Sequence, residues 1–172
     1  HKPVACVTTM RDPEGRFSVG DMLSAMERRL FPVGRLDYHS SGLLVLTDDG
    51  QLAERLTHPR YHLAKTYVAK VSRRPGTGAV RQLRQGVELS DGCTAPANVV
   101  VRGGAGGKAW VEITIAEGRN QQVRRMFEAV GVRVEKLRRA AIGPLELGKL
   151  PTGAMRRMEA AELLALKQAV GL

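Results

Sequence analysis

Side chains repeat with a period of two along the segment Lys65–Val71. Tyr67, Ala69 and Val71 fall on one face of this extended segment, and the residues between them fall on the other. A period of two predicts a β-strand, because successive side chains of a strand point to opposite faces of the sheet. On this interpretation Tyr67 faces the interior with the two aliphatic residues.

Other apolar stretches predict further strands. Ala97–Arg102 and Lys108–Ala116 are rich in β-branched residues, and the glycine-rich segment Gly103–Gly107 lies between them. This arrangement is typical of a β-hairpin with a glycine loop. The loop lacks the GxxxxGK[ST] spacing of a phosphate-binding loop, so we do not assign a nucleotide site to it. Two more strands are expected at Gly42–Thr47 and Val132–Ala141.

Helical spacing of apolar residues, three and four positions apart, predicts five helices. Ser18 and Asp21 have the spacing of a capping box at the start of the first, and Asp48–Gly50 turns the chain before the second. The fourth helix has a core stripe of Val123, Met126, Phe127 and Val130, and the fifth is expected to be amphipathic. The second helix is expected to be capped by Asp48–Gly50, to carry Leu52, Ala53 and Leu56, and to stop at His58-Pro59. The other expected helices are Val19–Leu30, Ala79–Gln85, Asn120–Val130 and Glu159–Val170.

Strands therefore neighbour strands at several points, which argues against a regular alternation of strands and helices. We predict an α+β fold, with a mixed, largely antiparallel sheet flanked by helices. A chain of 172 residues is long enough for one domain with a sizeable core, and no break in composition indicates a second. The expectation is a single domain over residues 1–172, and nothing in the sequence demands more than a monomer.

Charge and composition narrow the possible partners. The 27 basic residues outnumber the 17 acidic ones, which gives a net charge of +10 and favours a polyanion such as nucleic acid. Cys6 and Cys93 lie far apart and are expected to be reduced core thiols of a cytoplasmic protein. The four histidines show no metal-ligand spacing, so no metal is expected. No apolar run approaches the ~20 residues of a membrane span, so we expect no membrane association.

The segment Gly34–Leu44 carries the most informative chemistry. It places the carboxylate of Asp37 between an arginine, Arg35, and a glycine-bounded apolar run. A charge at the edge of a core strand is costly to desolvate unless it has a partner or a task. The simpler interpretation is an aspartate that opens a turn. Further motifs along the chain favour a functional carboxylate.

These motifs together resemble the ribosomal RNA pseudouridine synthases of the RsuA/RluB type. The resemblance covers nearly the whole chain, in the order that the family shows, but no segment resembles the small S4-like RNA-binding domain that usually precedes this catalytic domain. It implies a pseudouridine synthase catalytic fold that needs no cofactor. The motifs that carry it are His1-Lys2-Pro3, the segment around Asp37, Thr57–Tyr61, Lys65-Thr66-Tyr67, Arg119–Phe127 and Ile142–Leu145.

The resemblance also implies roles for individual residues. Asp37 is the catalytic carboxylate, acting as a nucleophile or as a base at the sugar, and Arg124 is its ionic partner. The competing interpretation places Arg124 on a solvated basic face, although it directly follows the core residue Val123. Tyr67 offers a flat surface for an extruded uracil, although a core tyrosine is the commoner case. Arg35 and Lys65 are cations that support the site.

Phosphate contacts are expected from Lys2, Arg119 and Arg125. The implied reaction converts a specific uridine of ribosomal RNA, that of the large subunit in the RluB-like branch, to pseudouridine. The alternative is a non-catalytic RNA-binding module of ribosome assembly. Such a module would explain the positive charge equally well, but it would not explain the motifs. An RNA methyltransferase is less consistent, because no glycine-rich turn follows a predicted strand and opens a helix.

Overall fold

The computed structural model describes residues 1–24 and 26–172, which form two compact units. Unit 1 comprises His1–Leu63 and Arg139–Leu172, and unit 2 comprises Ala64–Arg138. The strand β9 (Val134–Ile142) contributes its first residues to unit 2 and its last to unit 1. In the described part of the chain, no helix is both long and apolar enough to cross a membrane.

Unit 2 is built on the strands that the sequence pattern predicts. They are β4 (Lys65–Val71), β7 (Asn98–Arg102) and β8 (Ala109–Ile115), with β4 between β9 and β8. Both β4 and β7 pair with β8 in antiparallel fashion, in registers that place Tyr67 opposite Ile113 and Val99 opposite the same residue. A short hairpin of β5 (Glu88–Leu89) and β6 (Gly92–Cys93) completes the strands of this unit. The predicted hairpin with a glycine loop is confirmed.

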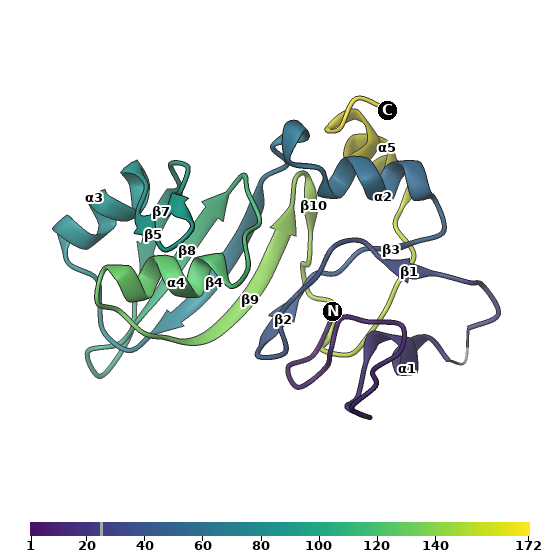
Figure 1. Ribbon diagram of the computed structural model, residues 1–172, viewed down its shortest axis with the longest axis horizontal. Helices are drawn as coiled ribbons and strands as arrows, with labels where there is room; N and C mark the ends of the chain where they lie inside the picture. Colours follow the sequence, from purple (N-terminus) through teal and green to yellow (C-terminus); the bar gives the residue numbers. More distant parts are fainter. Residues whose placement is uncertain (25) are drawn as a thin grey trace. The chain divides into compact units, whose positions relative to one another are not determined.

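Two helices cover one face of this sheet. They are α3 (Thr77–Gln85) and α4 (Gln122–Ala129), and Figure 1 shows α4 lying across the strands. The fully buried residues Leu83 of α3 and Phe127 of α4 pack with the inward residues of the strands. The expected core stripe of α4 is confirmed for Val123, Met126 and Phe127, while Val130 is half-buried at its edge.

Unit 1 packs two helices around a second core. α2 (Gly50–Thr57) begins where predicted, because the Asp49 carboxylate accepts a hydrogen bond from the Leu52 amide (2.9 Å). It ends at His58, before the single 3-10 turn η1 (Pro59–Tyr61). The last helix, α5 (Ala160–Gln168), lies beside it, and Arg55 of α2 donates to the carbonyl of Val170 (3.1 Å).

The prediction that the last helix is amphipathic is wrong. Leu166 is its only buried residue among those described, and Leu164 is 58% exposed. Leucines therefore occupy both the inner and the outer side of this helix. The presence of leucines in a helical segment does not by itself show which side of the helix faces the core.

The first predicted helix is also shorter than expected. α1 (Val19–Leu23) has the predicted capping box between Ser18 and Asp21, but it ends with Ser24 as its C-cap. The Ser24 hydroxyl donates to the Asp21 carbonyl (2.8 Å), so a side chain forms a hydrogen bond with a carbonyl at the end of the helix. Of the remaining positions of the prediction, Ala25 lies outside the described residues, and residues 26–30 are not helical.

The apolar run Gly42–Thr47 forms no continuous strand. β2 (Ser40–Gly42) ends at Gly42 and β3 (Leu46–Thr47) begins four residues later, paired with β1 (Phe31–Pro32). Strand β2 pairs with β9, which also pairs in antiparallel fashion with β10 (Leu145–Glu146). Together with a parallel bridge between Val7 and Ser18, these ladders confirm a mixed, largely antiparallel α+β fold.

The cysteines differ in their surroundings. Cys6 is completely buried, as predicted, and burial raises the pKa of its thiol. Cys93 is exposed at the β5–β6 hairpin, so the expectation of a second core thiol is wrong. A cysteine in a short hairpin has no core to enter.

Candidate active site

Asp37 lies in unit 1, in the loop between β1 and β2, and is half-buried. Its backbone carbonyl accepts a hydrogen bond from the Ser40 amide (3.0 Å), so residues 37–40 form a tight turn. Aspartate is common at the first position of such turns. The simpler interpretation of Asp37 as a turn residue is therefore correct for its backbone, and it leaves the carboxylate available for other work.

Both neighbours of Asp37 are held by the loop at residues 2–9. The Thr8 hydroxyl donates to the carbonyl of Leu36 (2.7 Å), and the amide of Ala5 donates to the carbonyl of Tyr38 (2.8 Å). A site needs supporting contacts of this kind, because a carboxylate on a loose loop cannot keep its position. The segment that carries Asp37 is thus fixed on both sides of the carboxylate.

Lys2 lies beneath this segment rather than on the surface. Its backbone forms two hydrogen bonds with Gly42, and its ammonium donates to the carbonyls of Pro3 (2.8 Å) and Cys6 (2.6 Å). Burial lowers the pKa of the Lys2 ammonium, and the negative charge of Asp37 counteracts this shift. The residue is 2% exposed. The expected phosphate contact of Lys2 does not agree with this burial, because an enclosed ammonium cannot reach a phosphate in solvent.

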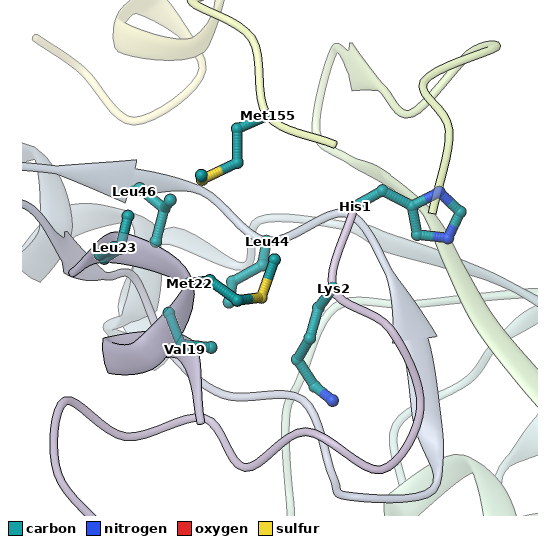
Figure 2. Close-up of a pocket in the computed structure, with 8 residues that line it drawn as sticks. All are labelled: His1, Lys2, Val19, Met22, Leu23, Leu44, Leu46 and Met155. Carbon is teal, nitrogen blue, oxygen red and sulfur yellow. The ribbon is translucent and has the colours of Figure 1, made fainter. Parts of the chain in front are cut away.

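Lys2 also lines a pocket in unit 1. Figure 2 shows the Lys2 side chain extending away from Met155 and Leu46, while apolar side chains surround the opening. The lining consists of His1, Lys2, Val19, Met22, Leu23, Leu44, Leu46 and Met155. No carboxylate is among these residues.

In unit 2, Tyr67 and Lys65 lie on strand β4. Tyr67 is half-buried and packs against the core that contains Ala69 and Val71, so its predicted inward direction is confirmed. Lys65 stands at the first position of the strand, opposite Ile115, and is also half-buried. The ring of Tyr67 is thus braced by the core but not fully enclosed.

The three arginines near α4 have different surroundings. Arg119 precedes the helix and donates to the carbonyls of Gly92 (2.8 Å) and Cys93 (2.7 Å) in the β5–β6 hairpin. Arg125 binds both carboxylate oxygens of Asp91 in the same hairpin. Arg119 and Arg125 therefore fasten the hairpin to the start of α4. Their expected contacts with RNA remain predictions, and each contact would compete with these internal bonds.

Arg124 is half-buried and donates to the carbonyl of Val134 (3.2 Å), within unit 2. The expected partner Asp37 belongs to unit 1, so the pairing of these two residues remains a prediction. Arg35 lies two positions before Asp37 in unit 1 and is exposed. In the described part of the chain, no group of three or more His, Cys, Asp and Glu residues could hold a metal ion.

The ion pair between Arg125 and Asp91 makes stability depend on pH. The hydrogen bonds from Arg125 lower the pKa of Asp91 to about 2, below its ordinary value of 3.8. A lowered pKa in the folded state contributes stability above the unfolded pKa, and this contribution is lost as the pH falls from about 4 toward 2.

We therefore expect Asp91→Asn to lower the melting temperature at neutral pH but not at the acid end of this window. Thermal unfolding of both proteins, followed by circular dichroism across the window, measures the difference. A difference that persists unchanged near pH 2 would contradict the ion-pair explanation.

One residue that the sequence interpretation missed is Arg139. It lies on β9 and is 4% exposed, among inward residues such as Leu137 and Ile142. Its guanidinium donates to the carbonyl of Leu43 (2.8 Å), just beyond β2. The sequence feature that could have revealed Arg139 is its position on a predicted strand, two residues after Leu137 and therefore on the same inward face.

Comparisons with known proteins identify the family. The family model described as RNA pseudouridylate synthase matches residues 1–129. An RNA pseudouridine synthase of Aquifex aeolicus is 43% identical over 100% of this chain and 70% of its own. The ribosomal large subunit pseudouridine synthase B of Bacillus subtilis is 43% identical over 97% of this chain and 69% of its own.

Solved structures agree with this result. A crystal structure of a pseudouridylate synthase superimposes with a TM-score of 0.85 at 32% identity, over 96% of this chain and 70% of that one. Its similarity extends through both units, beyond the residues that the family model matches. The predicted resemblance to the RsuA/RluB type is confirmed, and the chain belongs to the RNA pseudouridylate synthase family.

Proposed function

We propose that this chain isomerises a specific uridine of large-subunit ribosomal RNA to pseudouridine, and that Asp37 is its catalytic carboxylate. The observation that carries the proposal is the fixed, half-buried position of Asp37 in a member of this family. The RNA class is supported by the similarity to the large-subunit enzyme of Bacillus subtilis, at 43% identity. The net charge of +10 is consistent with an RNA partner.

The reaction rearranges bonds within one nucleotide. The N1–C1′ glycosidic bond breaks, the uracil turns, and C5 forms a bond to C1′; N1 gains a proton and C5 loses one. No electron acceptor is consumed, so the work of the protein is to bind, orient and exclude water. A carboxylate at C1′ can form a temporary ester with the sugar, and a carboxylate near the ribose can instead remove a proton. Asp37 can serve in either way.

Arg124 and Tyr67 complete the proposed site. Arg124 would keep the Asp37 carboxylate ionised, because an opposite charge within about 4–6 Å favours the charged form. Tyr67 would stack on the extruded uracil, since its ring is held by the core yet only half-buried. Arg35 and Lys65 would add positive charge for the neighbouring phosphates.

The test of the proposed function is pseudouridine mapping on large-subunit ribosomal RNA that starts without modifications. One new pseudouridine with this chain, absent with Asp37→Ala, is the expected result. A new pseudouridine with both proteins would exclude Asp37 as the catalytic group. Binding without product would exclude this RNA as the substrate, and small-subunit RNA would then be mapped in the same way.

A change of Tyr67 tests the stacking role. Tyr67→Phe should keep the rate within about threefold, whereas Tyr67→Leu should weaken productive binding by about ten- to a hundredfold, since stacking on an aromatic ring is worth ~1–3 kcal/mol per base. Single-turnover rates over a range of enzyme concentrations measure both effects. Complete loss of activity in Tyr67→Phe would show that the hydroxyl acts directly and that stacking is not the main role.

A further inference from the structure

Arg139 is a cation in the interior of unit 1, with 4% of its surface exposed. Charged side chains are almost never buried so deeply unless they are paired or hydrogen-bonded, because removal from water is costly. The acceptors that the structure shows for this guanidinium are backbone carbonyls. Its surroundings therefore call for an explanation other than a simple ion pair.

The hydrogen bonds of Arg139 hold the segment that carries Asp37 at two places. Nε donates to the carbonyl of Leu43 (2.8 Å), and Nη1 lies 3.4 Å from the carbonyl of Arg35. The backbone carbonyl of Arg139 also accepts from the amide of Leu43 (2.9 Å). One residue of β9 thus contacts the chain two positions before Asp37 and six positions after it.

The third nitrogen of the guanidinium has no acceptor. Nη2 of Arg139 is buried, and no hydrogen-bond partner for it exists in the described part of the chain. A residue selected for stability alone would not leave a donor unsatisfied, because apolar side chains fill such positions without that cost. The unsatisfied donor indicates that Arg139 is kept for what it does to the segment around it.

Lys2 also contacts the segment that Arg139 holds. The ammonium of Lys2 is influenced by both residues, since the Asp37 carboxylate stabilises its charge and the Arg139 guanidinium opposes it. Lys2 in turn forms two backbone hydrogen bonds with Gly42, between Asp37 and Leu43. Two buried cations of unit 1 therefore hold the chain just after Asp37, Lys2 through Gly42 and Arg139 through Leu43.

We infer that Arg139 is a positioning residue, which sets the place of the Asp37 carboxylate by tying the carbonyls of Arg35 and Leu43 to strand β9. This inference rests on the proposed catalytic role of Asp37. The planar guanidinium suits this task, because it donates in two fixed directions at once, whereas a lysine ammonium is a single point on a flexible stem. A catalytic group displaced by about 1 Å can lose about a hundredfold in rate.

The experiment compares the wild-type chain with Arg139→Lys and Arg139→Met. Three quantities are measured for each protein: the single-turnover rate at saturating enzyme, the Kd for large-subunit ribosomal RNA, and the melting temperature. Arg138→Lys is the matched control, because Arg138 is the exposed neighbour on the same strand. Asp37→Ala is measured in parallel on the same RNA.

We expect both Arg139 variants to react about ten- to a hundredfold more slowly, with Kd within about threefold of the wild type. Arg139→Lys keeps the positive charge, so its melting temperature should fall least, while Arg138→Lys should match the wild type in rate. A loss of rate without a loss of binding is the mark of a misplaced carboxylate. A residue with only a structural role would not separate the two quantities.

Two results would overturn the inference. One is a folded Arg139→Lys or Arg139→Met variant whose rate lies within about threefold of the wild type. The other is a parallel fall of rate, binding and melting temperature in both variants, which assigns Arg139 to the stability of the fold. Activity retained by Asp37→Ala would instead refute the proposed function, and an inactive wild type on this RNA would refute its substrate; either removes the basis of the inference as well.

Discussion

Asp37→Asn is expected to stop the isomerisation while the protein stays folded and still binds RNA. If the carboxylate acts as a base, its loss should cost about 10²–10⁴-fold in the single-turnover rate. If it acts as a nucleophile, no product should form, because the amide has no charged oxygen to bond to C1′. Residual activity measured by pseudouridine mapping therefore separates the two mechanisms.

The structure explains why binding should survive this change. The turn at residues 37–40 is closed by the backbone carbonyl of Asp37, which asparagine also provides. The side chain of Thr8 holds Leu36 and the backbone of Ala5 holds Tyr38, and neither contact uses the carboxylate of Asp37. Lys2 loses the influence of a negative charge, but its ammonium keeps two carbonyl acceptors.

Asp48→Asn is the matched control for this experiment. Asp48 is an exposed carboxylate of the same unit, paired with Arg28 on the surface (2.7 Å). Exposed ion pairs contribute little to stability, so this variant should keep both rate and melting temperature. Equal activity of Asp37→Asn and Asp48→Asn would remove Asp37 from the mechanism.

Gly42→Ala should have the largest effect on stability. Gly42 has φ +119°, which L residues rarely adopt, and an added Cβ would lie 2.3 Å from the carbonyl oxygen and 2.5 Å from the amide nitrogen of Arg139. Both atoms belong to the backbone of β9, so no side chain can move aside. We expect a loss of about 3 kcal/mol or more, because backbone strain and a backbone clash act together.

A loss of that size should lower the melting temperature by about 6–12 °C in a domain of this length. Gly50→Ala is the control, since no atom lies within 4 Å of a Cβ at this first residue of α2. Alanine favours helices over glycine, so this variant should be as stable as the wild type or slightly more so. A Gly42→Ala protein that melts within about 2 °C of the wild type would show that β2 and β9 can separate at little cost.

The close approach at Gly42 also explains an error of sequence interpretation. The run Gly42–Thr47 is apolar throughout and looks like one strand, but β2 ends at its first residue. Beyond it, two hydrogen bonds hold Leu43 to Arg139: the Arg139 side chain donates to the carbonyl of Leu43, and the amide of Leu43 donates to the backbone carbonyl of Arg139. These bonds come from a residue nearly a hundred positions away, so no local pattern could reveal them.

The elements predicted well are those whose residues repeat regularly over a sufficient length. Strands β4 and β8 have seven residues each, β7 is rich in valine, and helix α4 has a core stripe that matches its helical period. The short elements around Asp37 have two or three residues each, too few for any period to show. Their conformation comes from contacts with the loop at residues 2–9 and with β9.

Residues within a few positions of one another therefore predicted most of the helices, the longest strands, the positive charge and the family motifs, and they singled out Asp37 as a candidate. The tertiary structure determined which charged side chains are buried. Lys2 and Arg139 are cations, yet both are buried. Lys2 donates to the carbonyls of its close neighbours Pro3 and Cys6, and Arg139 donates to the carbonyl of the distant Leu43. Conversely, Cys93 and Leu164 look like core residues but are exposed. The composition of a segment indicates which of its side chains tend to be buried. Whether they are buried depends on the residues that the rest of the chain packs against them.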